Sequence, residues 1–216
     1  MFKLTPKLTF LHGFLGAPED WEGVISYLPS IPCCALSYPF NIPPDGILVG
    51  YSLGGRIASS YPHPKILISS HPGLATEEEK KTRRAWENKW LALLKHLPFS
   101  QFLEAWYNQP FFASLKKSPN FPALFERRLS CSREVALHQF ETHLLSNQPY
   151  HISSNTHFLC GTEDLKYMNL YNELSLNPLL IARSSHACHL EQPAACAHAI
   201  LDRVRHLSRH QVSQRS

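Results

Sequence analysis

A serine in a glycine-flanked turn is the strongest chemical signal in the chain. The segment Gly50-Tyr51-Ser52-Leu53-Gly54-Gly55 follows an apolar run directly and opens a helix-like segment. This is the G-x-S-x-G pattern, in which a tight strand-to-helix turn exposes the serine hydroxyl as a nucleophile. The alternative is a chance serine in a glycine-bearing turn, but the strand–turn–helix context favours the nucleophile.

A nucleophilic serine needs a base, and the base needs a carboxylate that orients it. In this kind of site the chain order is serine, acid, histidine, each after a later strand. Asp164 follows the apolar run 157–160, and His186 follows the run 179–182, so both fall in the required order. Two alternatives stay open: Asp164 could cap a helix N-terminus instead, and His189 is a rival base farther from the strand end.

The developing negative charge of such a reaction needs two backbone N–H donors. The residue after the serine, Leu53, supplies one of them. The loop Leu11-His12-Gly13-Phe14-Leu15-Gly16 follows an early strand, and its Phe14 amide is the candidate for the second. An ordinary strand–helix turn is the alternative for this loop.

A group of histidines and cysteines near the C-terminus raises the question of a metal site. It contains His186, Cys188, His189, Cys196 and His198. Their spacing matches no common zinc pattern, and the last two are expected on a helix out of reach of the others. We therefore expect no bound metal.

The elements that must position these residues can be read from the apolar pattern. Six short apolar runs lack the alternation of half-exposed strands and are typical of strands buried on both faces of a parallel sheet. They lie at residues 7–11, 33–37, 47–50, 65–69, 157–160 and 179–182, with helix-like segments at 18–28, 53–61 and 191–207. This alternation predicts an α/β fold with a mostly parallel sheet and helices on both faces. Its core would comprise residues 1–72 and 151–207.

One long stretch breaks the alternation. Residues 76–148 are helical in character, hold three of the four tryptophans, and are divided by prolines at 98, 110, 119 and 122. They form either a bundle that packs on itself or a helical cap inserted over the strand ends, where α/β folds bind ligands. Because strands resume afterwards, we expect a cap at residues 73–150. The polar residues 208–216 are expected to be a disordered tail.

Composition limits the classes of partner. The 216 residues carry a net charge of +4 with dispersed basic residues, which lacks the clustered basic face of a nucleic-acid binder. Six cysteines without a secretory signal indicate reduced thiols in a cytoplasmic protein. No apolar run reaches the roughly 18 residues of a membrane span, so no membrane partner is expected.

Several segments together resemble a known family, the 2-succinyl-6-hydroxy-2,4-cyclohexadiene-1-carboxylate synthases of menaquinone biosynthesis. The resemblance runs from about Leu11 to Pro193, through LHGFLG with a later DW, GYSLGGR, SSHPGL followed by EEEKKTR, EAWYNQPFFASL, GTEDLKY and HACHLEQP. The turn and the triad alone indicate only the α/β-hydrolase superfamily. HPGL, WYNQPFFASL and the arginine directly after the turn glycines are more specific.

The resemblance implies a cofactor-free lyase. It would eliminate pyruvate from 2-succinyl-5-enolpyruvyl-6-hydroxy-3-cyclohexene-1-carboxylate by proton abstraction, with Ser52, Asp164 and His186 as the triad and the Phe14 and Leu53 amides stabilising the anion. The substrate is a small polycarboxylate with three carboxylates, which guanidinium groups bind bidentately. By resemblance the binding residues are Arg56, Arg83 and either Arg127 or Arg128, with Tyr51 and Trp106 beside them. For Arg83 and Arg127 a solvated surface charge is the alternative.

The sequence departs from the family pattern at several places. The fold would be reduced at the N-terminus, because the chain starts at what corresponds to the third strand. Ser37-Tyr38-Pro39-Phe40-Asn41 replaces the loop D-x-P-G-H-G, and Ser185 stands where a glycine usually precedes the histidine. Only residues 41–46 link the 33–37 strand and its loop to the 47–50 strand, whereas a parallel crossover usually needs a dozen or more residues. We therefore expect the helix before the serine strand to be absent.

Such a shortened scaffold could be a monomer or a homodimer, or could have changed its substrate. Two other functions stay open. The first is a small carboxylesterase or thioesterase that uses the same triad for acyl transfer. The second is a catalytically silent homologue that only binds a ligand or a partner.

Overall fold

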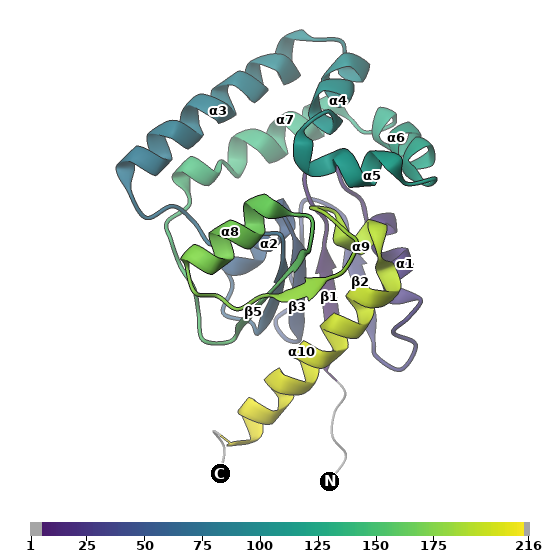
Figure 1. The fold of residues 1–216 in the computed structure, drawn as a ribbon, viewed down its shortest axis with the longest axis vertical. Helices are drawn as coiled ribbons and strands as arrows, with labels where there is room; N and C mark the ends of the chain where they lie inside the picture. The colour runs from purple at the N-terminus through teal and green to yellow at the C-terminus, as the bar shows by residue number, and fades with distance from the viewer. Residues whose placement is uncertain (1–5, 214–216) are drawn as a thin grey trace.

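The fold is built on a parallel sheet (Figure 1). The computed structural model describes residues 6–213, with side chains up to residue 207. Within them, six strands pair in the order β2-β1-β3-β4-β5-β6, all parallel. They are β1 (Leu8–Leu11), β2 (Cys33–Leu36), β3 (Ile47–Tyr51), β4 (Lys65–Ile68), β5 (Thr156–Gly161) and β6 (Leu179–Ile181). Each agrees with a predicted run to within one residue at either end, which confirms the predicted sheet.

Helices cover both faces of the sheet because successive side chains of each strand point to opposite faces. On one face Phe10 and Val49 belong to a core shared with α1 (Glu22–Ile25), α9 (Cys188–Glu191) and α10 (Pro193–Ser213). On the other, Leu11 and Leu48 pack with α2 (Leu53–Ser59) and α8 (Leu165–Glu173). This two-sided burial explains why the strand sequences show no polar alternation.

The connection from β2 to β3 passes across β1 without a helix. Residues 37–46 form turns and extended chain in the structure, which confirms the expected loss of the crossover helix. Phe40 and Ile42 of this loop pack on the α2 and α8 side of the sheet. The Tyr38 hydroxyl lies 2.9 Å from His138 Nδ1 and 3.2 Å from His143 Nε2. The loop thus covers part of the sheet and contacts the helical insertion described next.

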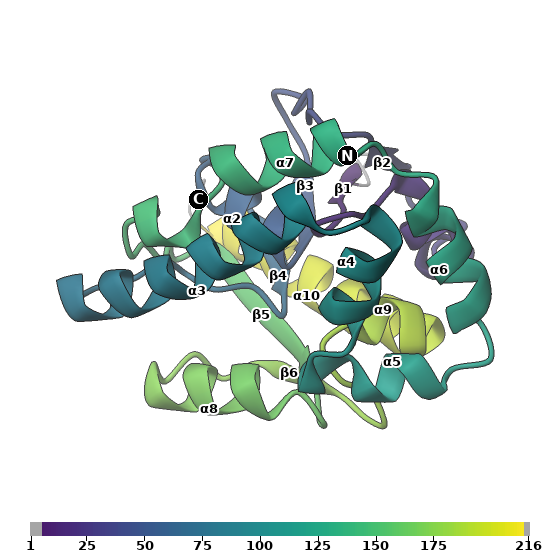
Figure 2. The same cartoon turned by 90° about the horizontal axis from the view of Figure 1, so that it is seen from above.

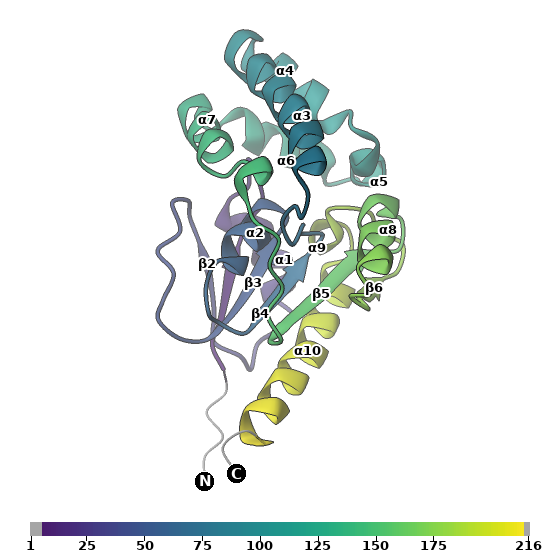
Figure 3. The same cartoon turned by 90° about the vertical axis from the view of Figure 1, so that its left-hand side faces the viewer.

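Five helices are inserted between β4 and β5 and lie over the carboxyl ends of the strands (Figures 1 and 3). Seen from above, α3, α4 and α7 cross the sheet (Figure 2). The helices are α3 (Glu77–His96), α4 (Phe99–Tyr107), α5 (Ala113–Lys117), α6 (Phe121–Leu129) and α7 (Arg133–Thr142). Thr76 starts α3 with a capping box, accepting from the Glu79 amide while the Glu79 carboxylate accepts from the Thr76 amide. The predicted helical cap is therefore confirmed.

The chain enters and leaves this cap at one place. Leu74 and Pro149 form an isolated parallel bridge, and the His151 amide donates to the Pro72 carbonyl oxygen at 2.9 Å. Between them, Gly73 has φ +107°, and a Cβ there would collide with the Pro149 carbonyl group. The glycine of the HPGL segment is thus required by a close approach of two chain segments.

The prediction of a disordered tail at residues 208–216 is wrong for residues 208–213. Helix α10 runs to Ser213, so residues 208–213 are helical rather than a disordered tail. No glycine or proline interrupts residues 194–213, and each residue added to a formed helix gains a hydrogen bond, so the polar residues extend α10. Residues 214–216 lie outside the described chain. No helix of residues 6–213 is long and apolar enough to cross a membrane.

Candidate active site

The predicted nucleophile lies in a strained turn at the end of β3. Ser52 has φ 50° and ψ −109°, a conformation that L residues rarely adopt, and it immediately precedes α2. A Cβ at Gly50 would approach the Gly55 Cα to 2.5 Å, and one at Gly54 would collide with the carbonyl oxygens of Leu11 and His12. The glycines therefore let β1, β3 and α2 meet closely enough to present the serine.

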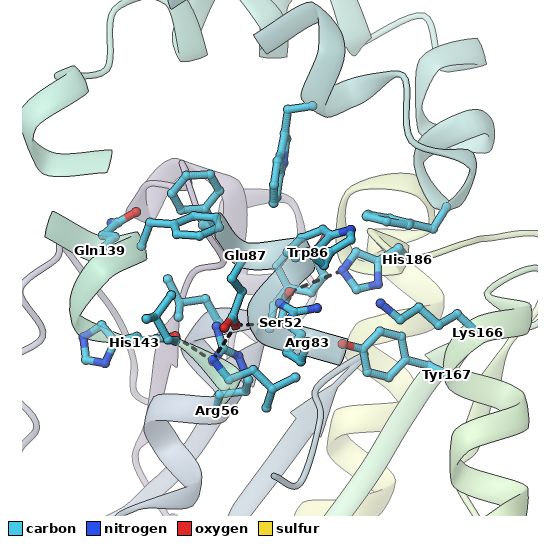
Figure 4. A pocket seen from close by; sticks show the side chains of 18 of the residues that line it. Ser52, Arg56, Arg83, Trp86, Glu87, Gln139, His143, Lys166, Tyr167 and His186 are labelled. Carbon is cyan, nitrogen blue, oxygen red and sulfur yellow. Dashed lines mark hydrogen bonds and ion pairs between the residues drawn. The ribbon is translucent and has the colours of Figure 1, made fainter. Parts of the chain in front are cut away.

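Three predicted residues form a continuous hydrogen-bonded chain. His186 Nε2 lies 3.3 Å from Ser52 Oγ (Figure 4), and His186 Nδ1 lies 3.1 Å from Asp164 Oδ2. The other carboxylate oxygen of Asp164 accepts from the Tyr167 amide at 3.4 Å and caps α8. Both sequence interpretations of Asp164 thus describe the same side chain, with one oxygen for the helix and one for the histidine.

The surroundings favour an ionised Asp164. Burial alone would raise its pKa, but the hydrogen bond and charge of His186 and the Tyr167 amide outweigh that effect and lower the pKa. His189, the rival base, lies between the rings of Tyr51 and Trp21, with centroids 4.2 Å and 4.6 Å away. Burial lowers the pKa of His189 to about 3. The structure therefore brings His186, and not His189, to the serine.

The two predicted oxyanion donors both line the pocket beside Ser52. They are Phe14, after β1, and Leu53, the first residue of α2. Neither amide donates a hydrogen bond to any residue of the described chain. The next amide, of Leu15, donates to Gln139 Oε1 of α7 at 3.3 Å. The cap thus holds the loop that carries Phe14.

The pocket over the serine has an aromatic wall. Trp106 packs on Phe14 with ring centroids 4.9 Å apart, and Tyr51 lies 5.2 Å from the His186 ring. Burial keeps Tyr51 neutral, because it raises its pKa well above the ordinary value. The other aromatic residues at the pocket are Trp86, Phe111, Phe112, Phe140 and Tyr167. Apart from Phe14, Tyr51 and Tyr167, these rings come from the cap.

Two of the predicted arginines reach this pocket. Arg56 of α2 donates to the His143 carbonyl oxygen at 2.7 Å, and burial lowers its pKa to about 10, so it stays charged at neutral pH. Arg83 of α3 donates through Nε to Glu87 at 2.9 Å and lies 4.1 Å over the Trp86 ring. Buried Glu87 also accepts from the Leu145 amide at 2.7 Å. These contacts orient both guanidinium groups toward the cavity (Figure 4).

The other two predicted arginines, Arg127 and Arg128, lie outside the pocket at Ser52 in this structure. Arg128 is buried, donates to Asp20 Oδ2 at 2.6 Å, and lies 3.1 Å from the Tyr107 hydroxyl. Arg127 donates to the other oxygen of Asp20 at 2.9 Å and is half exposed. Neither lines the pocket at Ser52. A buried carboxylate competes for these guanidinium groups, and the local sequence does not reveal that contact.

Several pocket residues had no distinct sequence signal. Glu87, Gln139 and His143 belong to cap segments whose helical pattern does not say which side faces the sheet. Lys166 lies two residues after Asp164, inside the quoted segment GTEDLKY, and that position was the available clue. Phe111 and Phe112 lie in the segment WYNQPFFASL, but their place beside His186 depends on the packing of the cap.

The loop that carries His186 is held by Ser185, the residue directly before the histidine. Its hydroxyl donates to the Phe111 carbonyl oxygen of the cap at 2.8 Å, and its amide lies 3.2 Å from a Glu191 carboxylate oxygen. Cys188 and Cys196 nearby are buried free thiols, as Cys160 is. No group of three potential metal ligands occurs within the described residues.

The sheet order, the inserted cap and the serine turn at the end of β3 define an α/β-hydrolase fold. MenH from S. aureus superposes on the chain with a TM-score of 0.81 at 20% identity, covering 95% of this chain and 96% of that one. No protein-family model matches the chain.

Relatives with similar sequences identify the family within this fold class. The 2-succinyl-6-hydroxy-2,4-cyclohexadiene-1-carboxylate synthase of Enterobacter sp. (strain 638) is 30% identical over 230 residues, covering 89% of each chain. The synthase of Salmonella typhimurium is 28% identical over 239 residues, covering 93% of this chain and 94% of its own. The protein belongs to the 2-succinyl-6-hydroxy-2,4-cyclohexadiene-1-carboxylate synthase family.

Proposed function

We propose that the protein eliminates pyruvate from 2-succinyl-5-enolpyruvyl-6-hydroxy-3-cyclohexene-1-carboxylate, giving 2-succinyl-6-hydroxy-2,4-cyclohexadiene-1-carboxylate in menaquinone biosynthesis. The observation that carries the proposal is the chain Asp164–His186–Ser52, which ends in a pocket with arginines and an aromatic wall, in a member of this family. The six free cysteines agree with a reaction in the cytoplasm.

The reaction balances within the substrate. The ring proton at C2 is acidic because the succinyl ketone is attached there, and its removal places negative charge on the ketone oxygen. That electron pair forms the C2–C3 double bond, the C3–C4 double bond moves to C4–C5, and the C5–O bond breaks. Pyruvate leaves as its enolate, which takes up a proton. No oxidant or cofactor is needed.

Each step has a candidate group in the pocket. Ser52 takes the C2 proton while passing its own to His186, whose Nδ1 is held by Asp164. The amides of Phe14 and Leu53 stabilise the charge on the ketone oxygen, because they have no other acceptor in the described chain. Arg56 and Arg83 bind carboxylates, and Tyr51 and Trp106 pack beside the ring.

The test is pyruvate release from the synthesised intermediate by the purified protein. We expect turnover by the parent and a loss of at least a hundredfold in Ser52→Ala, since a positioned proton-transfer group contributes about 10²–10⁴-fold. Ser60→Ala, on the exposed end of the same helix, is the matched control and stays active. No release above background, or an equally active Ser52→Ala, would sink the proposal.

Acyl transfer on a small ester or thioester is the second candidate. The strained Ser52 turn and the histidine contact are also the arrangement that a serine hydrolase uses. Strong fluorophosphonate labelling at Ser52, with turnover of simple esters and no pyruvate release, would favour a serine hydrolase over the lyase. Stabilisation by a carboxylate ligand without turnover of either substrate would indicate a binding protein.

A further inference from the structure

The pocket at Ser52 contains a third cationic side chain, Lys166, besides the two arginines. Arg56 already has the His143 carbonyl oxygen as a partner, and Arg83 has the Glu87 carboxylate. Lys166 makes no hydrogen bond or ion pair within the described residues, although it lines the same cavity. Its positive charge is therefore the one at this pocket that lacks a polar partner from the described chain.

The position of Lys166 directs its charge into the site. It is the second residue of α8, and its ammonium group points into the pocket between His186 and Tyr167, toward Arg83 (Figure 4). The nitrogen lies 5.6 Å from the ring centroids of both Phe111 and Tyr167, within the range of cation–π contact. These two rings, one from the cap and one from α8, hold the flexible side chain toward the cavity.

The local electrostatics favour an anion at this point. The Lys166 side chain is exposed to solvent overall, but its ammonium group lies among the residues of the pocket wall. Desolvation of this group, together with repulsion from Arg83 and Arg56, lowers the pKa of Lys166. The attraction of Asp164 offsets only part of this effect. A carboxylate placed between Lys166 and Arg83 would relieve the repulsion between the two cations and give Lys166 the polar partner that it lacks.

We propose that Lys166 of α8 and Arg83 of the cap form an anion subsite that binds one carboxylate of an aromatic-sized polycarboxylate ligand. The subsite joins the sheet side of the pocket to the cap side, so a bound carboxylate draws the two together. This inference rests on the proposed function in that the ligand is the polycarboxylate substrate. It assigns to Lys166 a carboxylate-binding role in the pocket that Arg127 and Arg128 do not line.

The test measures equilibrium binding, so it does not depend on turnover. Benzene-1,3-dicarboxylate is the probe, and the uncharged benzene-1,3-dicarboxamide is its isosteric control; both are titrated by calorimetry. We expect Lys166→Met to weaken dicarboxylate binding about tenfold, the size of one charge-assisted hydrogen bond, without changing diamide binding. Lys166→Arg restores the affinity, and Lys89→Met on the exposed side of α3 leaves it unchanged.

The pH dependence separates a charged subsite from a packing role. Affinity for the dicarboxylate is full where Lys166 is protonated and falls as pH rises past its pKa of about 8. Lys166→Met and Lys166→Arg lack this fall. Both keep the other titratable groups around the subsite, which are Arg56, His71, Arg83, Glu87, Asp164, Tyr167 and His186.

Equal dicarboxylate affinity in wild type and Lys166→Met overturns the subsite. So does a wild type that does not prefer the dicarboxylate to the diamide. If the Lys166 effect is found but no pyruvate is released, the subsite stands and the proposed lyase reaction fails. If pyruvate is released and the Lys166 effect is absent, the reaction stands and the subsite fails.

Discussion

Arg56 Nη1 donates a hydrogen bond of 2.7 Å to the carbonyl oxygen of His143. The bond joins the helix that follows the serine turn to His143, the residue directly after the cap helix α7. The same guanidinium group faces the pocket, so Arg56 holds the cap at the position where the proposed substrate binds. Substitutions at Arg56 should therefore affect both the closure of the cap and the binding of ligand.

We expect Arg56→Met to lower kcat/KM for pyruvate release about tenfold or more, because a hydrogen bond to a charged group contributes about 1.5–3 kcal/mol. The measurement is steady-state kinetics, together with hydrogen exchange of residues 138–148, which should become faster. Arg84→Met, an exposed arginine on α3, is the control. Unchanged kinetics and exchange in Arg56→Met would contradict this role.

Asp164→Asn separates orientation of His186 from capping of α8. An asparagine still caps a helix, but it lacks the negative charge that stabilises the imidazolium, and its NH2 group can donate to Nδ1 and favour the wrong imidazole tautomer. We expect the melting temperature to stay close to that of the parent and kcat to fall about 10²–10⁴-fold. Asp45→Asn, on the exposed β2–β3 loop, should change neither quantity. A variant that unfolds, or one with parental kcat, would argue against the assignment.

The buried pair Asp20–Arg128 predicts a large effect on stability. Both side chains are 3% exposed, so Asp20→Asn leaves a buried guanidinium without its counter-charge. Such a loss costs about 3–5 kcal/mol of the free energy of unfolding. Arg127→Ala removes only the half-exposed partner of the same carboxylate and should cost less than about 1 kcal/mol. Urea denaturation measures both, and similar losses in the two variants would refute the distinction.

Ser185 offers a test of the contact between the histidine loop and the cap. Its hydroxyl bond to the Phe111 carbonyl oxygen contributes about 1 kcal/mol, which Ser185→Ala should remove. Ser185→Gly should cost a further ~0.4–1 kcal/mol by freeing the unfolded backbone. Denaturant midpoints measure the two steps. A glycine variant as stable as the parent would mean that the serine adds nothing to the cap contact.

The sequence predicts the sheet and the serine site well because local signals define both. Apolar runs indicate the six strands. Glycines at positions where a Cβ would collide with neighbouring backbone indicate the turn at Ser52. Parallel strands end at the same edge of the sheet, so Asp164 after β5 and His186 after β6 are expected at the edge where Ser52 follows β3. The missing crossover helix was also predictable, because six residues are too few to form it.

The cap residues were harder to predict because their neighbours come from distant parts of the chain. The resemblance to the family implies a binding role for Arg127 or Arg128, yet Asp20, more than a hundred residues away in the chain, binds both. Lys166 and Glu87 are ordinary charged residues in helical segments until α3 and α8 are placed around one cavity. The end of α10 is polar, which is typical of disordered tails, but it contains no residue that breaks a helix, so polarity alone does not predict its structure.

The bridge between Leu74 and Pro149 has a consequence for the folding of the whole chain. The two ends of the cap are held side by side by this bridge. Because the entropy cost of closing an inserted segment grows only slowly with its length, a longer or shorter cap would change the free energy of folding little. Helices can be lengthened, lost or exchanged above this junction while the sheet and its serine turn keep their contacts. The junction thus makes the cap a replaceable module, and the residues that it contributes to the pocket can change while Ser52, Asp164 and His186 keep their positions.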